Sequence, residues 1–76
     1  MVKTKIVDIF VDLLGVSAEE VTDDARLIED LAVDSLDAVE LSLELEDQFN
    51  LTVEDHEIEQ LETVGDVVNL IQGKLG

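Results

Sequence analysis

The sequence predicts an all-α fold, a small antiparallel four-helix bundle with three longer helices and one short third helix. Three observations support this prediction. Apolar residues recur at spacings of three and four, no segment of useful length alternates like a strand, and the connections are short except for one long loop. A chain of 76 residues holds one thin hydrophobic core. We therefore expect a single domain over residues 1–76.

The first helix is expected over residues 4–14. Its apolar residues have helical spacing, and they are Ile6, Ile9, Phe10, Leu13 and Leu14. Gly15 follows as a C-terminal stop. Ser17 to Glu20 has the form of a capping box and predicts at most a short turn. Residues 22–32 lack sustained periodicity, so a long pinned loop is expected between the first and second helices.

Residues 36–49 give the strongest helical pattern, because they contain good helix formers and neither Gly nor Pro. Asn50 is expected to end this helix. Two capping-box patterns follow, Thr52 to Asp55 and Thr63 to Asp66, if Asp takes the place of Glu. They predict a short helix near 54–60 and a longer one near 64–72, which Gly73 is expected to close.

Composition limits the class of partner and the compartment. Twenty acidic residues against four basic ones give a formal net charge of -16, which repels nucleic acid and anionic membranes and favours proteins with Lys/Arg patches. The absence of cysteine excludes disulfides, a thiolate nucleophile and a thiolate zinc site, and it agrees with a reducing compartment. The N-terminal segment resembles neither a signal peptide nor a membrane span. We expect a cytoplasmic monomer without membrane insertion.

Ser35 lies at the start of the second predicted helix, and three interpretations of it compete. A catalytic nucleophile needs a base and a Gly-flanked turn, but the only histidine is His56 and no glycine flanks the serine. A helix N-cap is the second interpretation, yet Asp34 fits better, because Asp37 completes a capping box with it. Ser35 then occupies the first helical position with a free hydroxyl. Such a helix end favours anions, so Ser35 suits a phosphate-linked modification.

The second predicted helix carries an acidic stripe beside two apolar faces. The stripe consists of Asp37, Glu40, Glu44 and Asp47. The first apolar face consists of Ala38, Leu41, Leu45 and Phe49. The second, next to the stripe, consists of Leu36, Val39 and Leu43. Either the helix packs on both sides and the stripe is solvated, or part of the second face is left for a basic, partly hydrophobic partner.

The segment Asp34-Ser-Leu-Asp-Ala-Val-Glu-Leu41 resembles the acyl carrier proteins, with Leu27-Ile-Glu-Asp-Leu31 before it and Leu45-Glu-Asp-Gln-Phe49 after it. The likeness covers nearly the whole chain. It implies that a holo-acyl-carrier synthase transfers 4'-phosphopantetheine from coenzyme A to Ser35. Acyl intermediates of bacterial type II fatty acid synthesis would then be held as thioesters on the imported thiol. The chain itself would be a non-catalytic carrier.

The resemblance also implies roles for further residues. Asp34 and Leu36 would flank the attachment site. Partner enzymes with basic patches would recognise six positions, and these are Asp37, Glu40, Leu43, Glu44, Glu46 and Asp47. Glu44 is included because it belongs to the acidic stripe. Glu46 is included on the resemblance alone, since the helical wheel places it away from the stripe. The core that shelters an acyl chain would include Leu45, Val53, Ile58, Leu61 and Val67.

The sequence departs from the family pattern at two positions and leaves alternative functions open. Ala32 and Glu54 stand where the family commonly has Gly and Pro, so a need for glycine torsions before Ser35 is doubtful.

Three alternative functions stay open. They are a carrier in polyketide or other thioester-dependent assembly, an acidic interaction domain without a prosthetic group, and a hydrolase. His56 is expected at the surface. No metal site is expected, because the acidic clusters do not match an EF-hand loop.

Overall fold

The computed structural model describes residues 2–76, which form four α-helices and one short 3₁₀ helix. These are α1 (Val2–Leu14), η1 (Ala18–Glu20), α2 (Ser35–Phe49), α3 (Asp55–Glu59) and α4 (Val64–Leu75). Within residues 2–76 there is no β-strand, only an isolated bridge between Arg26 and Thr63. The predicted all-α class, with three longer helices and a short third one, is confirmed.

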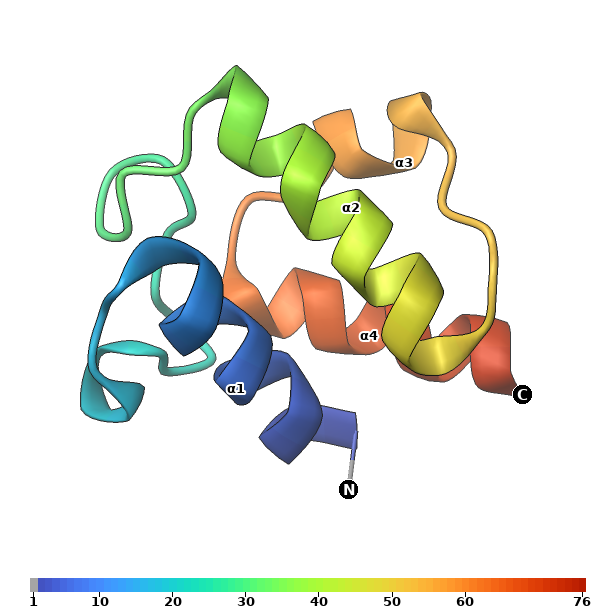
Figure 1. Ribbon diagram of the computed structural model, residues 1–76, viewed down its shortest axis with the longest axis horizontal. Helices are drawn as coiled ribbons and strands as arrows, with labels where there is room; N and C mark the ends of the chain where they lie inside the picture. Colours follow the sequence, from blue (N-terminus) through green and yellow to red (C-terminus); the bar gives the residue numbers. More distant parts are fainter. Residues whose placement is uncertain (1) are drawn as a thin grey trace.

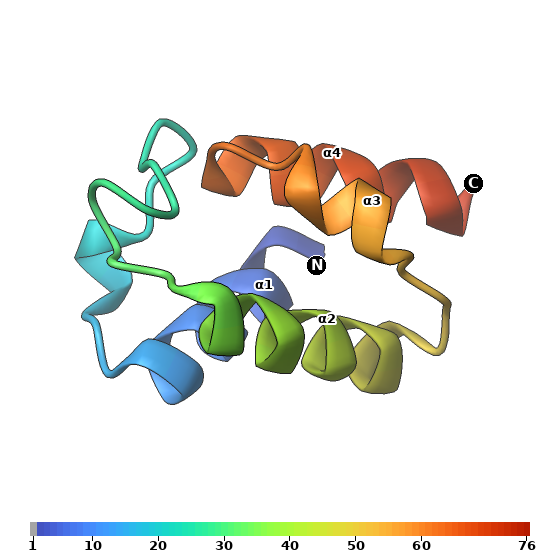
Figure 2. The same ribbon diagram turned by 90° about the horizontal axis from the view of Figure 1, so that it is seen from above.

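The three longer helices pack around one core, with α1 running opposite to α2 and α4 (Figures 1 and 2). The short helix α3 lies on the side of α2 away from α1 and returns the chain toward the start of α4, so α2 and α4 run in the same general direction (Figure 1). The segment between α1 and α2 contains only η1 as regular structure, which confirms the long predicted loop and the short turn after Ser17.

The core is almost entirely aliphatic. Its most deeply buried side chains come from α1, α2 and α4, and they are Ile6, Phe10, Leu41, Leu45, Val64, Val67 and Ile71. No polar or charged residue of the described chain is buried. Burial of each such side chain contributes about 1.5–3 kcal/mol. The helices are therefore held together by the apolar faces that their periodicity predicts.

Helix ends follow the predicted caps at four places. Gly15 ends α1 with a left-handed φ of 71°, and Asn50 ends α2 with a φ of 53°. The Asp34 and Asp37 pair forms the capping box of α2, and Thr63 with Asp66 forms that of α4. These local signals determine where α1 and α2 end and where α2 and α4 begin.

One predicted capping box and one predicted helix end were wrong. The short helix α3 lies within the expected range of 54–60, but its box joins Glu54 and Glu57 instead of Thr52 and Asp55. Val53 is buried and its amide donates to the Glu46 carboxylate at 2.9 Å, and Glu54 after it is extended, so the helix begins at Asp55. Gly73 does not close α4, which continues to Leu75, because Lys74 in the extra turn forms an ion pair with Glu57 at 2.9 Å.

The long loop is pinned to the segment that leads into α4. The Leu27 amide donates to the Glu62 carbonyl at 2.9 Å, and the amides of Val64 and Gly65 donate to loop carbonyls at 3.0 and 2.9 Å. A side chain at Gly65 would place its Cβ 3.1 Å from the Asp23 carbonyl oxygen, so glycine permits this close approach. The loop before Ser35 is therefore a fixed part of the fold.

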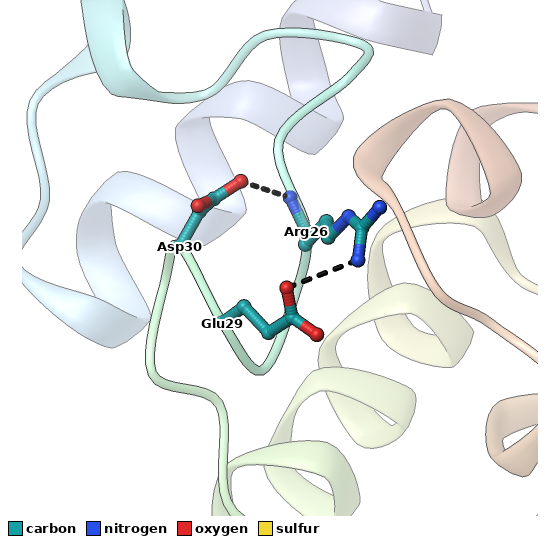
Figure 3. Close-up of polar contacts among 3 residues, drawn as sticks. All are labelled: Arg26, Glu29 and Asp30. Carbon is teal, nitrogen blue, oxygen red and sulfur yellow. Dashed lines mark hydrogen bonds and ion pairs between the residues drawn. The ribbon is translucent and has the colours of Figure 1, made fainter.

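Polar contacts within the loop hold its turn at Arg26. The Arg26 amide donates to the Asp30 carboxylate at 2.8 Å, and its guanidinium forms an ion pair with Glu29 at 3.0 Å (Figure 3). This turn directs Leu27 and Leu31 into the core, where both are buried. It leaves Ile28 on the outside, 73% exposed.

Candidate functional site

Ser35 is the first residue of α2, and its neighbours cap the helix. The Asp34 carboxylate accepts a hydrogen bond from the Asp37 amide at 2.9 Å, and the Asp37 carboxylate accepts one from the Asp34 amide at 3.3 Å. Asp34 itself is extended, with φ of -103° and ψ of -173°. The cap is thus Asp34, as predicted, and Ser35 is not needed for it.

The three serines of the chain differ in what their hydroxyl groups do. Ser42 donates to the Val39 carbonyl at 2.8 Å, and Ser17 donates to the Glu20 carboxylate at 3.2 Å. The exposed Ser35 hydroxyl has no hydrogen-bond partner anywhere in residues 2–76. Ser35 is therefore the serine whose oxygen is available to another molecule.

The helix start supplies a suitable environment for a phosphate at this oxygen. The amides of Ser35 and Leu36 have no acceptor among the described residues, because the cap engages Asp37 and Ala38 instead. Unpaired amides and the helix dipole stabilise negative charge at a helix N-terminus. By contrast, no side chain of residues 2–76 hydrogen-bonds the hydroxyl as a catalytic base would, so the geometry gives no support to the hydrolase alternative.

Two hollows meet at Ser35. The larger, of about 530 Å³, opens between α2, the pinned loop and α3, and its lining is mainly apolar. Its apolar residues are Leu27, Ile28, Val33, Ala38, Leu41, Ile58 and Leu61. The smaller, of about 300 Å³, lies between α2 and α3. Ser35, Ala38, Ile58 and Glu59 border both, so a group attached to Ser35 can lie along either.

The residues expected to shelter an acyl chain fall into two sets. Ile58 and Leu61 line the larger hollow and are half-buried. Leu45, Val53 and Val67 line neither hollow, because all three are buried within the packed core. Sequence reasoning did not assign the loop residues Ile28 and Val33 to this site. The non-periodic apolar segment around Leu27 was the available signal for them.

The second apolar face of α2 is exposed. Leu36 is 75% exposed, Val39 57% and Leu43 58%. Leu41 and Leu45 of the first face are buried, and Ala38 and Phe49 are half-buried against the core. The alternative in which α2 packs on both sides is therefore wrong. Three neighbouring apolar side chains at the surface are typical of a site that another protein covers.

The acidic positions of α2 differ in their surroundings. Glu40, Glu44 and Asp47 are exposed, whereas Asp37 is half-buried and takes part in the cap. Glu46 is also half-buried, and its carboxylate accepts a hydrogen bond from the Val53 amide at 2.9 Å. Glu46 therefore ties α2 to the segment before α3. Its expected role in partner recognition stays a prediction.

Glu57 fixes the position of α3, whose residues line one side of both hollows at Ser35. Its carboxylate accepts a hydrogen bond from the Glu54 amide at 2.9 Å and pairs with Lys74 of α4 at 2.9 Å. The hydrogen bond from Glu54 and the contact with Lys74 lower the pKa of Glu57 below its ordinary value. His56, beside it, is exposed, as expected.

Residues 2–76 contain no group of three or more His, Cys, Asp or Glu side chains placed to hold a metal ion. None of the helices in this range has the length and apolar character needed to cross a membrane.

Residues 4–71 match the protein family described as a phosphopantetheine attachment site. The chain belongs to this family of acyl carrier proteins. A structure assigned as an acyl carrier protein of Mycobacterium tuberculosis is similar, with TM-score 0.89 and 27% identity over 96% of this chain and 97% of that one. An acyl carrier protein of Enterococcus faecalis gives TM-score 0.81 and 36% identity over 96% of this chain and 92% of its own.

The site of this acyl carrier protein fits the 4'-phosphopantetheine of its family. The prosthetic group has an anionic phosphate at one end, which matches the unpaired amides at the start of α2. The rest of the group and its acyl chain can lie along the mainly apolar hollow beside Ser35. The chain has no cysteine, so the thiol for thioester chemistry comes with the prosthetic group.

Proposed function

We propose that this protein carries acyl intermediates of fatty acid biosynthesis on a 4'-phosphopantetheine attached to Ser35, in the cytoplasm and without catalysing a reaction itself. The observation that carries the proposal is the position of Ser35. It has a hydroxyl without a hydrogen-bond partner in residues 2–76, at the start of α2 and beside an apolar hollow. Nothing else among the serines of the chain combines these properties.

Attachment requires the Ser35 oxygen to act as a nucleophile. It attacks the phosphorus of coenzyme A that bears the pantetheine, a P–O bond to Ser35 forms, and adenosine 3',5'-bisphosphate leaves. The hydroxyl proton goes to a base of the separate transferase, because no side chain of residues 2–76 hydrogen-bonds the Ser35 hydroxyl. The attached group then supplies a thiol that holds acyl chains as thioesters. The reciprocal hydrogen bonds between Asp34 and Asp37 hold the helix start in place for this reaction.

Partner enzymes are expected to dock on α2. Glu40, Glu44 and Asp47 offer exposed negative charge beside the apolar side chains of Leu36 and Leu43. Charge attraction raises the association rate, while a small apolar patch adds contact without a large interface. A carrier needs this combination, because each enzyme must bind it quickly and then release it.

Shelter for the acyl chain is expected to begin in the larger hollow. Ile58 and Leu61 border this space, and Leu45, Val53 and Val67 form the next layer of the core. A longer chain would reach this layer only if these aliphatic side chains moved apart, at the cost of part of the stability that their burial supplies.

The proposal is tested by acylation in two steps. The protein is first loaded from coenzyme A by a phosphopantetheinyl transferase, and the holo form is then offered malonyl groups by the acyltransferase of fatty acid synthesis. We expect a thioester on the parent protein that a ketosynthase of fatty acid synthesis elongates, and none on Ser35→Ala. Acceptance only by polyketide enzymes would contradict the pathway, and failure of loading would contradict the carrier role.

A further inference from the structure

We propose that Ala32 is a strained hinge, and that its relaxation swings Val33 out of the core and opens the larger hollow beside Ser35. The observation that carries this inference is the φ of 57° at Ala32, in the left-handed region that residues with a side chain avoid. Ala32 lies three residues before Ser35, in the loop that forms one wall of the hollow. The inference rests on the proposed function only for the group that would enter the hollow.

The left-handed torsion is imposed by the residue that follows Ala32. The Ala32 side chain is exposed and its amide donates to no acceptor within residues 2–76, so neither group favours this conformation. A left-handed residue after a helical turn directs the next amides back to carbonyls of that turn. Here the Val33 amide donates to the Leu27 carbonyl at 2.8 Å, and the Val33 side chain is buried. These two contacts of Val33 hold Ala32 in a conformation that it would otherwise leave.

The loop segment that Ala32 closes has few other ties to the fold. In the described chain, residues 28–33 form hydrogen bonds and ion pairs only with Arg26 and Leu27, at the base of their own turn (Figure 3). That base is anchored separately, because the Leu27 amide donates to the Glu62 carbonyl at 2.9 Å. A break at Val33 therefore leaves the base of the turn in place, and the movement stays local.

Movement of Val33 would open the hollow at the end that is next to the attachment site. Val33, Asp34 and Ser35 follow one another along the lining, and Val33 is the buried one of the three. When Val33 leaves, its place among apolar side chains becomes available to the prosthetic group or acyl chain on Ser35. The capping box between Asp34 and Asp37 keeps the start of α2 fixed during this movement.

Relief of the strain at Ala32 makes this opening more frequent. In the open loop Ala32 takes an ordinary negative φ, so opening recovers what the left-handed torsion costs. A glycine has no such cost to recover, but it gains more freedom when the loop opens. With both effects counted, alanine should open about fivefold more often than glycine at this position. The alanine that departs from the family pattern thus gives this carrier a hollow that opens readily.

Hydrogen exchange of the unmodified protein tests the hinge without any loading step. Rates are compared as protection factors, which correct for the effect of neighbouring residues on intrinsic exchange. The Val33 amide should be protected at least about tenfold less than the Leu45 amide in α2, because it opens without global unfolding. Ala32→Gly should raise the protection of Val33 about fivefold. Protection of Val33 equal to that of Leu45, or unchanged by Ala32→Gly, would overturn the proposal.

Gly15→Ala is the control that separates the hinge from overall stability. Gly15 has a φ of 71°, so alanine there puts a similar strain at the end of α1, outside the hollow. This variant should lower the protection of Leu45, whose exchange requires global unfolding, and leave that of Val33 unchanged. An equal loss of protection at Val33 and Leu45 would show that Val33 opens only with the whole fold, which would contradict a local hinge.

The consequence for function is tested on protein loaded with a decanoyl chain that carries ¹³C at its terminal methyl. NMR exchange measurements give the rate at which this methyl moves between solvent and the hollow. Ala32→Gly should slow the movement about fivefold without changing the two populations, because the loop is closed in both. An unchanged rate would show that the chain enters by another route, against the proposal. If the parent is not loaded at all, the proposed function fails, whereas hydrogen exchange still judges the hinge.

Discussion

Ala32→Gly should stabilise the protein, although glycine usually weakens a fold. Ala32 has a φ of 57°, in the left-handed region that residues with a side chain avoid. This conformation costs an L-residue about 1–2 kcal/mol. Glycine removes that cost but has more freedom in the unfolded chain, which offsets about 0.4–1 kcal/mol. Ala32 is exposed, so no packing is lost, and the net gain is about 1 kcal/mol.

For a domain of this size, about 1 kcal/mol raises the melting temperature by about 4–8 °C. Thermal unfolding followed by circular dichroism measures the change, and urea unfolding gives the free energy independently. Gly15→Ala is the matched reverse change, because Gly15 has a φ of 71° with nothing within 4 Å of an added Cβ. It should destabilise by a similar amount. A lower melting temperature for Ala32→Gly, with the expected loss for Gly15→Ala, would refute the strain at Ala32.

Three further predictions follow from the charges and the exposed apolar face. Glu57 has a lowered pKa, so its contribution to the unfolding free energy should be present above pH 4.5 and disappear as the pH falls through the lowered value. Urea unfolding over pH should therefore show parent and Glu57→Gln converging in acid, and a constant difference would contradict this. Because the net charge is -16, the melting temperature should rise between about 0.01 M and about 0.15 M salt, and no dependence on ionic strength would be inconsistent with self-repulsion. Leu43→Ser should change stability by less than about 0.5 kcal/mol, because Leu43 is 58% exposed, yet raise the KM of a partner enzyme. A large loss of stability with an unchanged KM would show instead that the face is structural.

Local signals predicted most of the fold correctly. The spacing of Ile6, Ile9 and Phe10 predicted the buried face of α1, and the Asp34 and Asp37 box predicted the start of α2 to the residue. Both depend on neighbours within one or two turns, which a sequence displays directly. The position of Ser35 at the first helical residue followed from the same box.

Features that depend on distant contacts were missed. Gly73 looked like a helix end, but the pairing of Lys74 with Glu57 extends α4 beyond it. The capping box of α3 was expected at Thr52 and Asp55 but lies at Glu54 and Glu57, after the buried Val53. The larger hollow depends on how the pinned loop places Ile28 near Ser35. The torsion of Ala32 belongs to this group too. An alanine at this position argued against a left-handed backbone, yet the fixed loop holds Ala32 at a φ of 57°.

The central claim, that Ser35 carries the prosthetic group, is tested most directly by intact mass. The parent, Ser35→Ala and Ser42→Ala are incubated with coenzyme A and a phosphopantetheinyl transferase. Ser42 is the matched control, since it lies in the same helix but its hydroxyl donates to Val39. We predict a gain of one phosphopantetheine on the parent and on Ser42→Ala, and none on Ser35→Ala. No gain on the parent, or an equal gain on Ser35→Ala, would contradict the account.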